Sequence, residues 1–177
     1  MKSVLLLGAA GYIGQHLFQA LLREGYRVTC GVHARRLLPS CPTVAVDYST
    51  DHAERDWLPR LVGVDVVINC VGILRETAIA TFDAMHIAAP RALFRAAARS
   101  GVKKVIQVSA LGADCSAQSG YHRSKKAGDD ALAALDIPWV IVQPSLIFGP
   151  GGSSARLFSA LAALPLIPLP GHGEQRV

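Results

Sequence analysis

A tyrosine and a lysine lie four positions apart in the segment YHRSK, residues 121–125. On a helix this spacing places the side chains of Tyr121 and Lys125 on one face. A protonated lysine near a phenol favours the phenolate, so we expect the pKa of Tyr121 to fall from about 10 toward the working pH. Tyr121 would then exchange a proton with a carbonyl or alcohol oxygen of a substrate.

Ser109 completes a candidate catalytic set with this pair. It ends an apolar run, residues 103–109, that is typical of a buried strand. The carboxyl ends of strands are where doubly wound parallel sheets bind ligands. A Tyr-x-x-x-Lys pair alone is common by chance. Its meaning here comes from the order along the chain, which is a glycine loop, a strand-end serine and then the pair.

The glycine loop is the segment GAAGYIG, residues 8–14, between a predicted strand and a predicted helix. In such a loop one glycine allows a tight turn, one lets the backbone approach a pyrophosphate, and one lets the helix pack closely on the strand. The helix N-terminus adds free N–H groups and a partial positive charge. Gly8, Gly11 and Gly14 therefore predict a dinucleotide site, and the alternative is a purely structural turn.

The end of the second predicted strand bears on which dinucleotide is bound. A carboxylate at this point would bind the 2′-hydroxyl of NAD. The chain instead has His33, Arg35 and Arg36, and arginine matches the geometry of a 2′-phosphate. We therefore predict NADP, with NAD as the alternative, unless the arginines simply face solvent. Asp47, after the third strand, either contacts the adenine or caps a turn.

The elements that must position these residues alternate along the chain. Apolar runs predict strands at residues 2–7, 26–32, 43–46, 64–71, 103–109 and 139–142. Helices are expected at 12–24, 56–61, 78–100, 121–135 and 153–164, with a helical turn at 35–38. Pro90 either kinks its helix or starts a second segment. This α/β alternation predicts a Rossmann-type, doubly wound parallel sheet in three layers, α/β/α.

The composition excludes several classes of protein. Of 177 residues 51% are hydrophobic, which is enough for a core and excludes a disordered chain. The net charge is +5, but the basic residues occur singly or in short pairs, so we expect no nucleic-acid partner.

Membrane and metal sites are not expected either. No segment has the roughly 18 consecutive apolar residues of an integral membrane span. Glycines interrupt the apolar start, unlike a signal peptide, so we predict a cytoplasmic protein. The four cysteines show no metal-ligand spacing, and no metal site is predicted.

Taken in order, these motifs resemble the short-chain dehydrogenase/reductase superfamily. The resemblance is to its atypical and extended members, which include nucleoside-diphosphate-sugar epimerase-like proteins and the nucleotide-binding accessory subunit of respiratory complex I. The segments that support it are GAAGYIG at 8–14, NCVG at 69–72, VSALGA at 108–113, YHRSK at 121–125 and QPSLIFGPGG at 143–152.

The resemblance implies roles for individual residues. Ser109 would orient the substrate, Tyr121 would be the acid/base, and Lys125 would hold the nicotinamide ribose and tune Tyr121. Asn69, Val71 and Gly72 would pass close to the adenine-side ribose, and Pro144 to Ile147 would approach the carboxamide. The implied cofactor-binding set is Gly8, Gly11, Tyr12, Ile13, Gly14, His33, Arg35, Arg36, Asp47, Asn69, Val71, Gly72, Lys125, Pro144 and Ile147.

Two departures from the family pattern leave two functions open. The chain has Met85-His86 where an asparagine is usual, and Gln143 where an arginine is usual. We interpret His86 as a packing residue. One hypothesis is an NAD(P)-dependent oxidoreductase or epimerase/dehydratase that acts on a small-molecule substrate through a Tyr–Lys acid/base and hydride transfer. The other is a non-catalytic NAD(P)H sensor or a structural module of a respiratory complex, peripheral to its membrane.

The resemblance also suggests a domain division and an oligomeric state. We expect residues 1–152 to form the NAD(P)-binding domain and residues 153–177 to begin a C-terminal substrate-binding region. The chain would then be a fragment of a longer protein. The helices at 88–100 and 121–135 match helices that pair across a dimer axis in related enzymes, so a homodimer is expected. The alternative is that these helices only cover the sheet.

Overall fold

The computed structural model describes residues 2–33, 41–149, 151–152 and 159–163. The chain divides into two compact units, residues 1–143 and 144–177. In the second unit, residues 159–162 are helical, within the range where a helix is predicted. The predicted helical turn at 35–38 lies outside the described residues.

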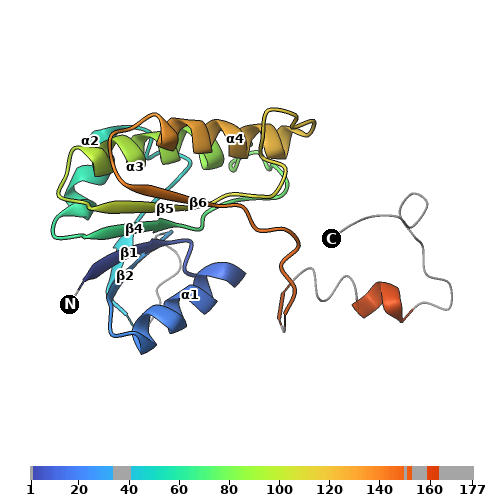
Figure 1. Cartoon of the computed structure of the whole chain (residues 1–177), viewed down its shortest axis with the longest axis horizontal. Coiled ribbons are helices and arrows are strands. Elements are labelled where there is room, and N and C mark those ends of the chain that lie inside the picture. The colour runs from blue at the N-terminus through green and yellow to red at the C-terminus, as the bar shows by residue number, and fades with distance from the viewer. Residues whose placement is uncertain (1, 34–40, 150, 153–158, 164–177) are drawn as a thin grey trace. The chain divides into compact units, whose positions relative to one another are not determined.

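The first unit is built on six parallel strands in one sheet. The order β3-β2-β1-β4-β5-β6 reverses direction between β1 and β4, which confirms the doubly wound prediction (Figure 1). At such a reversal the loops after the two strands diverge and leave a crevice. The strands are β1 Ser3–Leu7, β2 Arg27–Val32, β3 Thr43–Ala45, β4 Val66–Asn69, β5 Lys104–Val108 and β6 Trp139–Val142.

Helices cover the sheet on both faces, giving the predicted three layers. Helix α1 lies on one face and α2, α3 and α4 lie on the other (Figure 1). Short 3₁₀ and π segments, η1 and η2, precede β4 and α3 respectively. The bounds are α1 Tyr12–Arg23, α2 Glu54–Trp57, η1 Leu58–Leu61, η2 Asp83–Ala88, α3 Ala89–Ala98 and α4 Gly120–Ala133.

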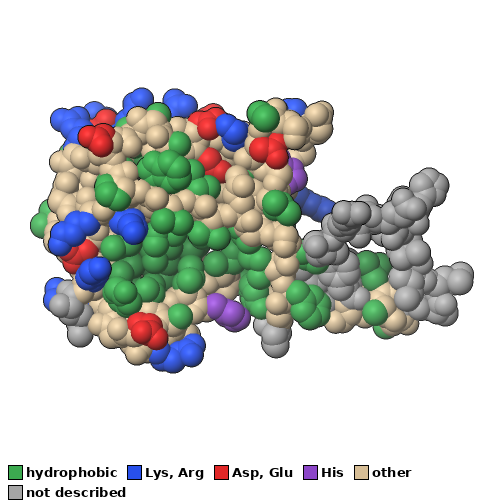
Figure 2. All heavy atoms as spheres, in the orientation of Figure 1, with side chains coloured by type: hydrophobic (Ala, Val, Ile, Leu, Met, Phe, Trp, Pro, Cys, Tyr) green, Lys and Arg blue, Asp and Glu red, His purple; other side chains and the backbone are tan. Residues whose placement is uncertain are grey.

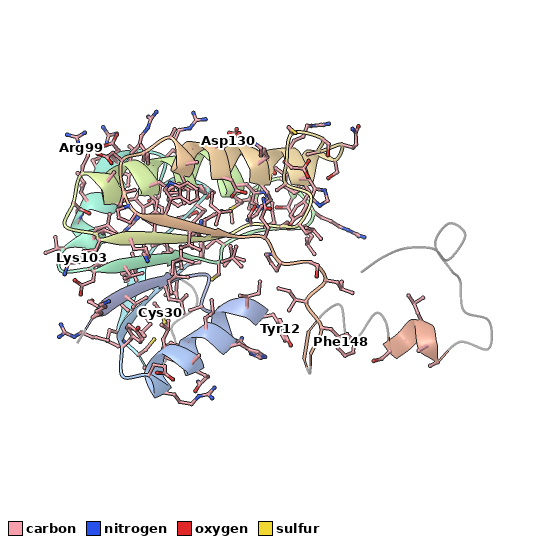
Figure 3. All side chains as sticks on the ribbon, viewed as in Figure 1. Tyr12, Cys30, Arg99, Lys103, Asp130 and Phe148 are labelled. Carbon is pink, nitrogen blue, oxygen red and sulfur yellow. The ribbon has the colours of Figure 1, made fainter. Side chains whose placement is uncertain are left out.

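Two hydrophobic cores follow from the position of β1 at the centre of the sheet. Alternate residues of a strand point to opposite faces. Leu5 and Leu7 therefore enter the larger core, under α2, α3 and α4, while Val4 and Leu6 enter the smaller core, under α1. Cys30 packs in the smaller core, between the sheet and α1 (Figure 3).

The predicted long helix over 78–100 starts later and has two parts. Residues 78–81 are not helical, because Thr81 caps the helix by accepting a hydrogen bond from the Ala84 N–H at 3.1 Å. Pro90 lies in the first turn of α3, which follows η2 without a break, and the helix changes from π to α type at this point. Pro90 thus starts a second segment, which is one of the two predicted alternatives. The first segment is the π-helical turn η2.

Strand β6 leaves apolar side chains uncovered within the first unit. Figure 2 shows hydrophobic side chains gathered over this side of the sheet. Trp139, Val140 and Val142 of β6 are 42%, 40% and 44% exposed. This strand also contributes to the site region, because the carbonyl of Val142 accepts a hydrogen bond from the Ser109 N–H at 2.8 Å.

Candidate functional site

A cavity of about 420 Å³ lies at the carboxyl edge of the sheet. It is formed by the loops after β1 and β4 and by the ends of β2 and β3, where the strand order predicts a ligand crevice. Its lining residues are Gly8, Ala10, Gly11, Gly31, Val32, His33, Val46, Asp47, Tyr48, Ser49, Cys70, Val71, Gly72, Ile79, Ala80 and Met85.

The glycine loop forms one wall of this cavity. Gly8 has a φ of +78°, and a Cβ there would come within 2.9 Å of the backbone of Cys70. Gly11 is the N-cap of α1, and within the described part of the chain no side chain caps this helix. Its first N–H groups therefore stay available for an anion. A Cβ on Gly14 would overlap the Gly8 carbonyl, so this glycine serves helix–strand packing.

Tyr12 and Ile13 start α1 but do not line the cavity. The Tyr12 ring packs against His16 with a centroid separation of 4.7 Å, at the end of α1 nearest the carboxyl edge (Figure 3). A cofactor contact from either residue would therefore be made by its backbone N–H, and it stays a prediction.

The ends of β2 and β3 bring His33 and Asp47 together. The His33 Nε2 lies 3.5 Å from the Asp47 Oδ2. Asp47 also accepts hydrogen bonds from the hydroxyl and the N–H of Ser49, which hold the pKa of its carboxyl below the ordinary value. Asp47 thus caps a turn and lines the cavity as a carboxylate. Arg35 and Arg36 lie outside the described residues.

Asn69, at the end of β4, has a different place from the one expected. Its side chain is fully buried and does not line the cavity. The amide oxygen accepts from the Tyr48 hydroxyl at 2.8 Å and the Val71 N–H at 3.2 Å, and the amide nitrogen donates to Gln107 at 2.8 Å. Asn69 therefore positions Val71 and the loop that follows it, and Val71 and Gly72 line the cavity.

Lys125 lies inside the fold and not at its surface. Its side chain is on α4, and the residue is 3% exposed. The Nζ donates a hydrogen bond to the Val108 carbonyl at 2.7 Å. Burial lowers the pKa of Lys125 to about 8, and the negative charge of Asp129 opposes part of this shift.

Tyr121 is half-buried among aromatic rings at the start of α4. Its ring makes edge contacts with Phe82, His86 and His122 at centroid separations of 6.1, 5.7 and 5.1 Å. Burial raises the pKa of Tyr121 above 10, so the expected lowering by Lys125 is wrong for this state of the site. The physical reason is that burial disfavours the charged phenolate, while Lys125 is not among the groups that shift the pKa of Tyr121.

Ser109 is tied to a residue that the sequence analysis did not single out. Its hydroxyl donates to the Asp129 Oδ2 at 2.5 Å, and Ser109 is 5% exposed. The hydroxyl proton is therefore engaged by Asp129, and the implied role of Ser109 in orienting a substrate stays a prediction. Asp129 lies one helical turn after Lys125, and its burial raises the pKa of its carboxyl. The signal for Asp129 was its i, i+4 spacing from Lys125.

Gly72 lies between the cavity and Lys125 of the Tyr–Lys pair. It lines the cavity, and a Cβ at this position would lie 3.7 Å from the Lys125 Nζ and 3.4 Å from the His86 Nε2. Lys125 is thus brought to the β4 end of the cavity. Tyr121 and Ser109 lie beyond its lining. Pro144 and Ile147 belong to the second unit, so their expected approach to a carboxamide stays a prediction.

Several cavity residues were not predicted. Tyr48 and Ser49 directly follow Asp47 at the end of β3, and Ile79, Ala80 and Met85 come from the long loop after β4 and from η2. The rule that ligands bind beyond strand ends was the available signal for Tyr48 and Ser49. Nothing in the hydrophobic pattern indicated that the loop after β4 folds back over the cavity.

Across 2–33, 41–149, 151–152 and 159–163, no three His, Cys, Asp or Glu residues gather in a way that could hold a metal ion. In the same ranges no helix is long and apolar enough to cross a membrane.

The sheet order and the glycine loop define a nucleotide-binding domain of the Rossmann type. A family model for the NAD dependent epimerase/dehydratase family matches residues 4–176, and the chain belongs to this family.

Two curated relatives show the range of proteins that share this sequence pattern. A ceramide reductase from Caulobacter vibrioides is 32% identical over 169 residues, which are 94% of this chain and 53% of the relative. The mitochondrial NADH dehydrogenase [ubiquinone] 1 alpha subcomplex subunit 9 from Mus musculus is 29% identical over 153 residues, which are 81% of this chain and 40% of the relative. The chain thus spans about half or less of each relative's length.

Solved structures show the same fold at lower sequence identity. MoeE5 in complex with UDP-glucuronic acid and NAD matches with a TM-score of 0.75 at 20% identity, over 91% of this chain and 60% of its own. UDP-glucuronic acid 4-epimerase from Bacillus cereus in complex with NAD matches with a TM-score of 0.67 at 22% identity, over 84% and 58%.

Proposed function

We propose that the first unit binds a nicotinamide dinucleotide in the cavity, with the pyrophosphate at the loop between β1 and α1. The observation that carries this proposal is the backbone of Gly8 and Gly11. Side chains at these positions would meet backbone atoms at 2.9 and 3.2 Å, and Gly11 also begins a helix with free N–H groups. The residues present therefore fit the group that the family name implies.

We propose NADP as the preferred form, with NAD as the alternative. No carboxylate ends β2, and His33 lines the cavity at that point. The neighbouring arginines, Arg35 and Arg36, would supply a phosphate-binding fork. Asp47 beside His33 suits a hydroxyl or an amino group of the adenosine half. A dinucleotide with its adenosine there would extend past Gly72 toward Lys125.

We further propose that Tyr121 and Lys125 are the catalytic residues of an oxidoreductase or epimerase/dehydratase. The dinucleotide, when bound, supplies or takes up a hydride. Tyr121 is a neutral phenol at pH 7, so it donates its proton to the carbonyl oxygen in the reducing direction and becomes a phenolate. In the oxidising direction Tyr121 must first lose its proton, and the phenolate then takes the proton of the alcohol. Lys125 uses one N–H on Val108, which leaves two for a ribose hydroxyl.

A non-catalytic dinucleotide-binding module is the second candidate function. It is supported by the hydroxyl of Ser109 being held by Asp129 and by the raised pKa of Tyr121. The similarity to a mitochondrial NADH dehydrogenase subunit supports the same candidate. In this case the chain would bind the dinucleotide, but Tyr121 would move no proton.

The binding proposal is tested by titrating the chain with NADPH and NADH, following the nicotinamide fluorescence. Gly11→Val adds an isopropyl group at a cavity-lining position whose φ of −80° a valine tolerates. We expect it to abolish binding. Gly101→Ala is the control, because a Cβ there meets nothing within 4 Å. An unchanged affinity of Gly11→Val for both NADPH and NADH would contradict the proposal.

Catalysis is tested on the complete protein with the substrates that the relatives' names provide. Ceramide with NADPH and UDP-glucuronic acid with NAD are the first pairs to assay. A turnover that Tyr121→Phe removes supports the enzyme. Turnover that Tyr121→Phe leaves intact excludes this role for Tyr121, and dinucleotide binding without turnover on any substrate supports the second candidate.

The division into a cofactor domain and a substrate-binding region, and a homodimer, are also proposals. The seven buried residues of α3 include Leu93 and Phe94, so this helix uses its apolar face to cover the sheet. A dimer would therefore depend on the outer face of α4. Sedimentation at high concentration tests it, and a monomer would exclude it.

A further inference from the structure

His86 is one of the most deeply buried polar residues of the first unit. It lies in the π-helical turn η2 and is 1% exposed. Both of its ring nitrogens have hydrogen-bond partners from other segments. The Nε2 lies 3.0 Å from the Ile73 N–H, in the loop after β4, and the Nδ1 lies 2.8 Å from the Ser124 hydroxyl on α4.

The partners determine the protonation state of the ring. A backbone N–H only donates, so the Nε2 must be the unprotonated acceptor. The Ser124 hydroxyl gives its single proton to the Tyr121 carbonyl at 2.7 Å, so its oxygen accepts from the Nδ1. Hydrogen bonds therefore run in one direction from Ile73 through His86 and Ser124 to Tyr121, and His86 is the neutral Nδ1–H tautomer.

The electrostatic surroundings agree with this assignment. Burial, and secondarily the charge of Lys125, lower the pKa of His86 to about 4. A charged ring would also lose the acceptor that the Ile73 N–H requires. The neutral ring is thus the form that satisfies every partner.

We propose that His86 is a positioning residue that holds the first turn of α4, and with it Tyr121, in register with the cavity loop at Gly72 and Ile73. The inference rests on the proposed function of Tyr121, which it deepens. Because both ring nitrogens are engaged, His86 has no free site for a substrate proton. It acts through Tyr121 and is not itself a catalytic residue.

Packing around His86 supports the same role. The ring stacks on Phe82 with centroids 5.4 Å apart and planes 19° apart, and it meets the Tyr121 ring edge-on at 5.7 Å. The His86 carbonyl lies against Gly128 of α4, where a Cβ would overlap it. The π-helical turn therefore contacts α4 in two places, through the side chain of His86 and through its backbone carbonyl.

The two hydrogen bonds of His86 can be removed separately. An asparagine amide reaches about as far as the Nδ1, so His86→Asn keeps a donor for Ser124 and loses the acceptor for Ile73. A glutamine amide reaches about as far as the Nε2, so His86→Gln keeps the acceptor for Ile73 and loses the donor for Ser124. Ser124→Ala removes both the acceptor for the His86 Nδ1–H and the bond to the Tyr121 carbonyl, and leaves the bond between Ile73 and His86 in place.

The matched control for Ser124→Ala is Ser100→Ala. Ser100 also donates its hydroxyl to the carbonyl three residues before it, that of Ala97 at 3.0 Å. It lies at the end of α3, and its loss removes the same local bond without a link to His86. An effect seen only in Ser124→Ala therefore belongs to the His86 connection.

The experiment combines three measurements on the full chain. ¹⁵N NMR at pH 7 identifies the tautomer of His86. The NMR signal of ¹³C-labelled Tyr121, assigned with Tyr121→Phe, reports on the surroundings of that side chain. Titration with NADPH measures the affinity of the cavity for the dinucleotide. We expect the Nδ1–H tautomer. We expect a shifted and broadened Tyr121 signal in Ser124→Ala and His86→Gln, but not in Ser100→Ala. We expect about tenfold weaker NADPH binding in His86→Asn, the size of one lost hydrogen bond.

Each outcome has a definite meaning. A charged or Nε2–H ring in the wild type, or a Tyr121 signal that is the same in Ser124→Ala as in Ser100→Ala, overturns the positioning role. Ser124→Ala keeps the test valid if the His86 variants do not fold. If the wild type binds no dinucleotide but the tautomer and Tyr121 results hold, the proposed function fails and the positioning of Tyr121 stands.

Discussion

Lys125 donates a hydrogen bond of 2.7 Å to the backbone carbonyl of Val108, the last residue of β5. The bond draws an ammonium group into the space between α4 and the sheet, where the residue is 3% exposed. A charge in that position is costly, because burial disfavours the charged form. The same bond connects α4, the helix of the Tyr–Lys pair, to β5, the strand that directly precedes Ser109. Lys125 therefore holds α4 and β5 together.

Replacing Lys125 with methionine is expected to stabilise the fold while removing function. The folded pKa of about 8 lies below the ordinary 10.5, so holding the charge at pH 7 costs about 3 kcal/mol. The lost hydrogen bond to Val108 offsets about 1 kcal/mol of the stability gained by removing the charge. We expect Lys125→Met to raise the free energy of unfolding in urea by about 1–2 kcal/mol, and to weaken NADPH binding. A lower urea midpoint would contradict the cost assigned to the buried charge.

The pH dependence of stability is expected to report on His86. Its folded pKa of about 4 lies below the ordinary 6.5, so the unfolded chain binds more protons between these values. The free energy of unfolding therefore falls as the pH drops from about 6.5 to about 4, by at most about 3 kcal/mol from this group. Urea melts at intervals of half a pH unit measure it. In His86→Gln this part of the slope should disappear, and an unchanged slope would show that another group causes it.

Position 8 is expected to require glycine for two reasons that can be tested separately. Its φ of +78° is strained for any other residue, and a Cβ would meet the Cys70 backbone at 2.9 Å. Gly25 has nearly the same φ, +75°, with nothing within 4 Å. Gly25→Ala should lose only the backbone preference, about 1 kcal/mol. Gly8→Ala should lose more than this and also NADPH binding. Equal losses in thermal melts would mean that the contact with Cys70 is unimportant.

The glycine loop could be predicted from the sequence because its geometry is local. The turn at Gly8, the cap at Gly11 and the packing at Gly14 all arise within seven consecutive residues, between a strand and a helix whose patterns are clear. The spacing of Tyr121 and Lys125 was predictable for the same reason, since one helical turn connects them.

The interactions that set the chemistry of the site could not be predicted in this way. Ser109 meets Asp129 across 20 residues and Asn69 meets Gln107 across 38, through the packing of α4 and the pairing of β4 with β5. The pKa of Tyr121 depends on its burial among rings that come from η2, the residue before it and α4. Spacing places residues on one face, but burial and bond partners decide their protonation.

Asp129 lies close to Gln143, the position where the chain departs from the family pattern. The Asp129 Oδ2 is bonded to Ser109, but its Oδ1 is buried and has no hydrogen-bond partner among the described residues. Gln143 lies close enough to Asp129 to oppose part of the rise in the pKa of its carboxyl, but the Gln143 amide nitrogen donates to the Ala113 carbonyl at 3.1 Å. An arginine at this position has donors enough for both acceptors, and a charged fork suits a carboxylate. Asp130, the residue after Asp129, lies on the outer side of α4 (Figure 3), where it is already paired with Lys126.

We therefore expect Gln143→Arg to raise the free energy of unfolding by about 1–2 kcal/mol at pH 7, which is the cost of an unsatisfied buried acceptor. The gain should be absent when Asp129 is also changed to asparagine, since the cycle of the two single variants and the double variant isolates the pair. The arginine would also hold the Asp129 carboxyl ionised, and an ionised Asp129 raises the pKa of Lys125. A stabilisation that persists in the Asp129→Asn background would show that the arginine acts elsewhere.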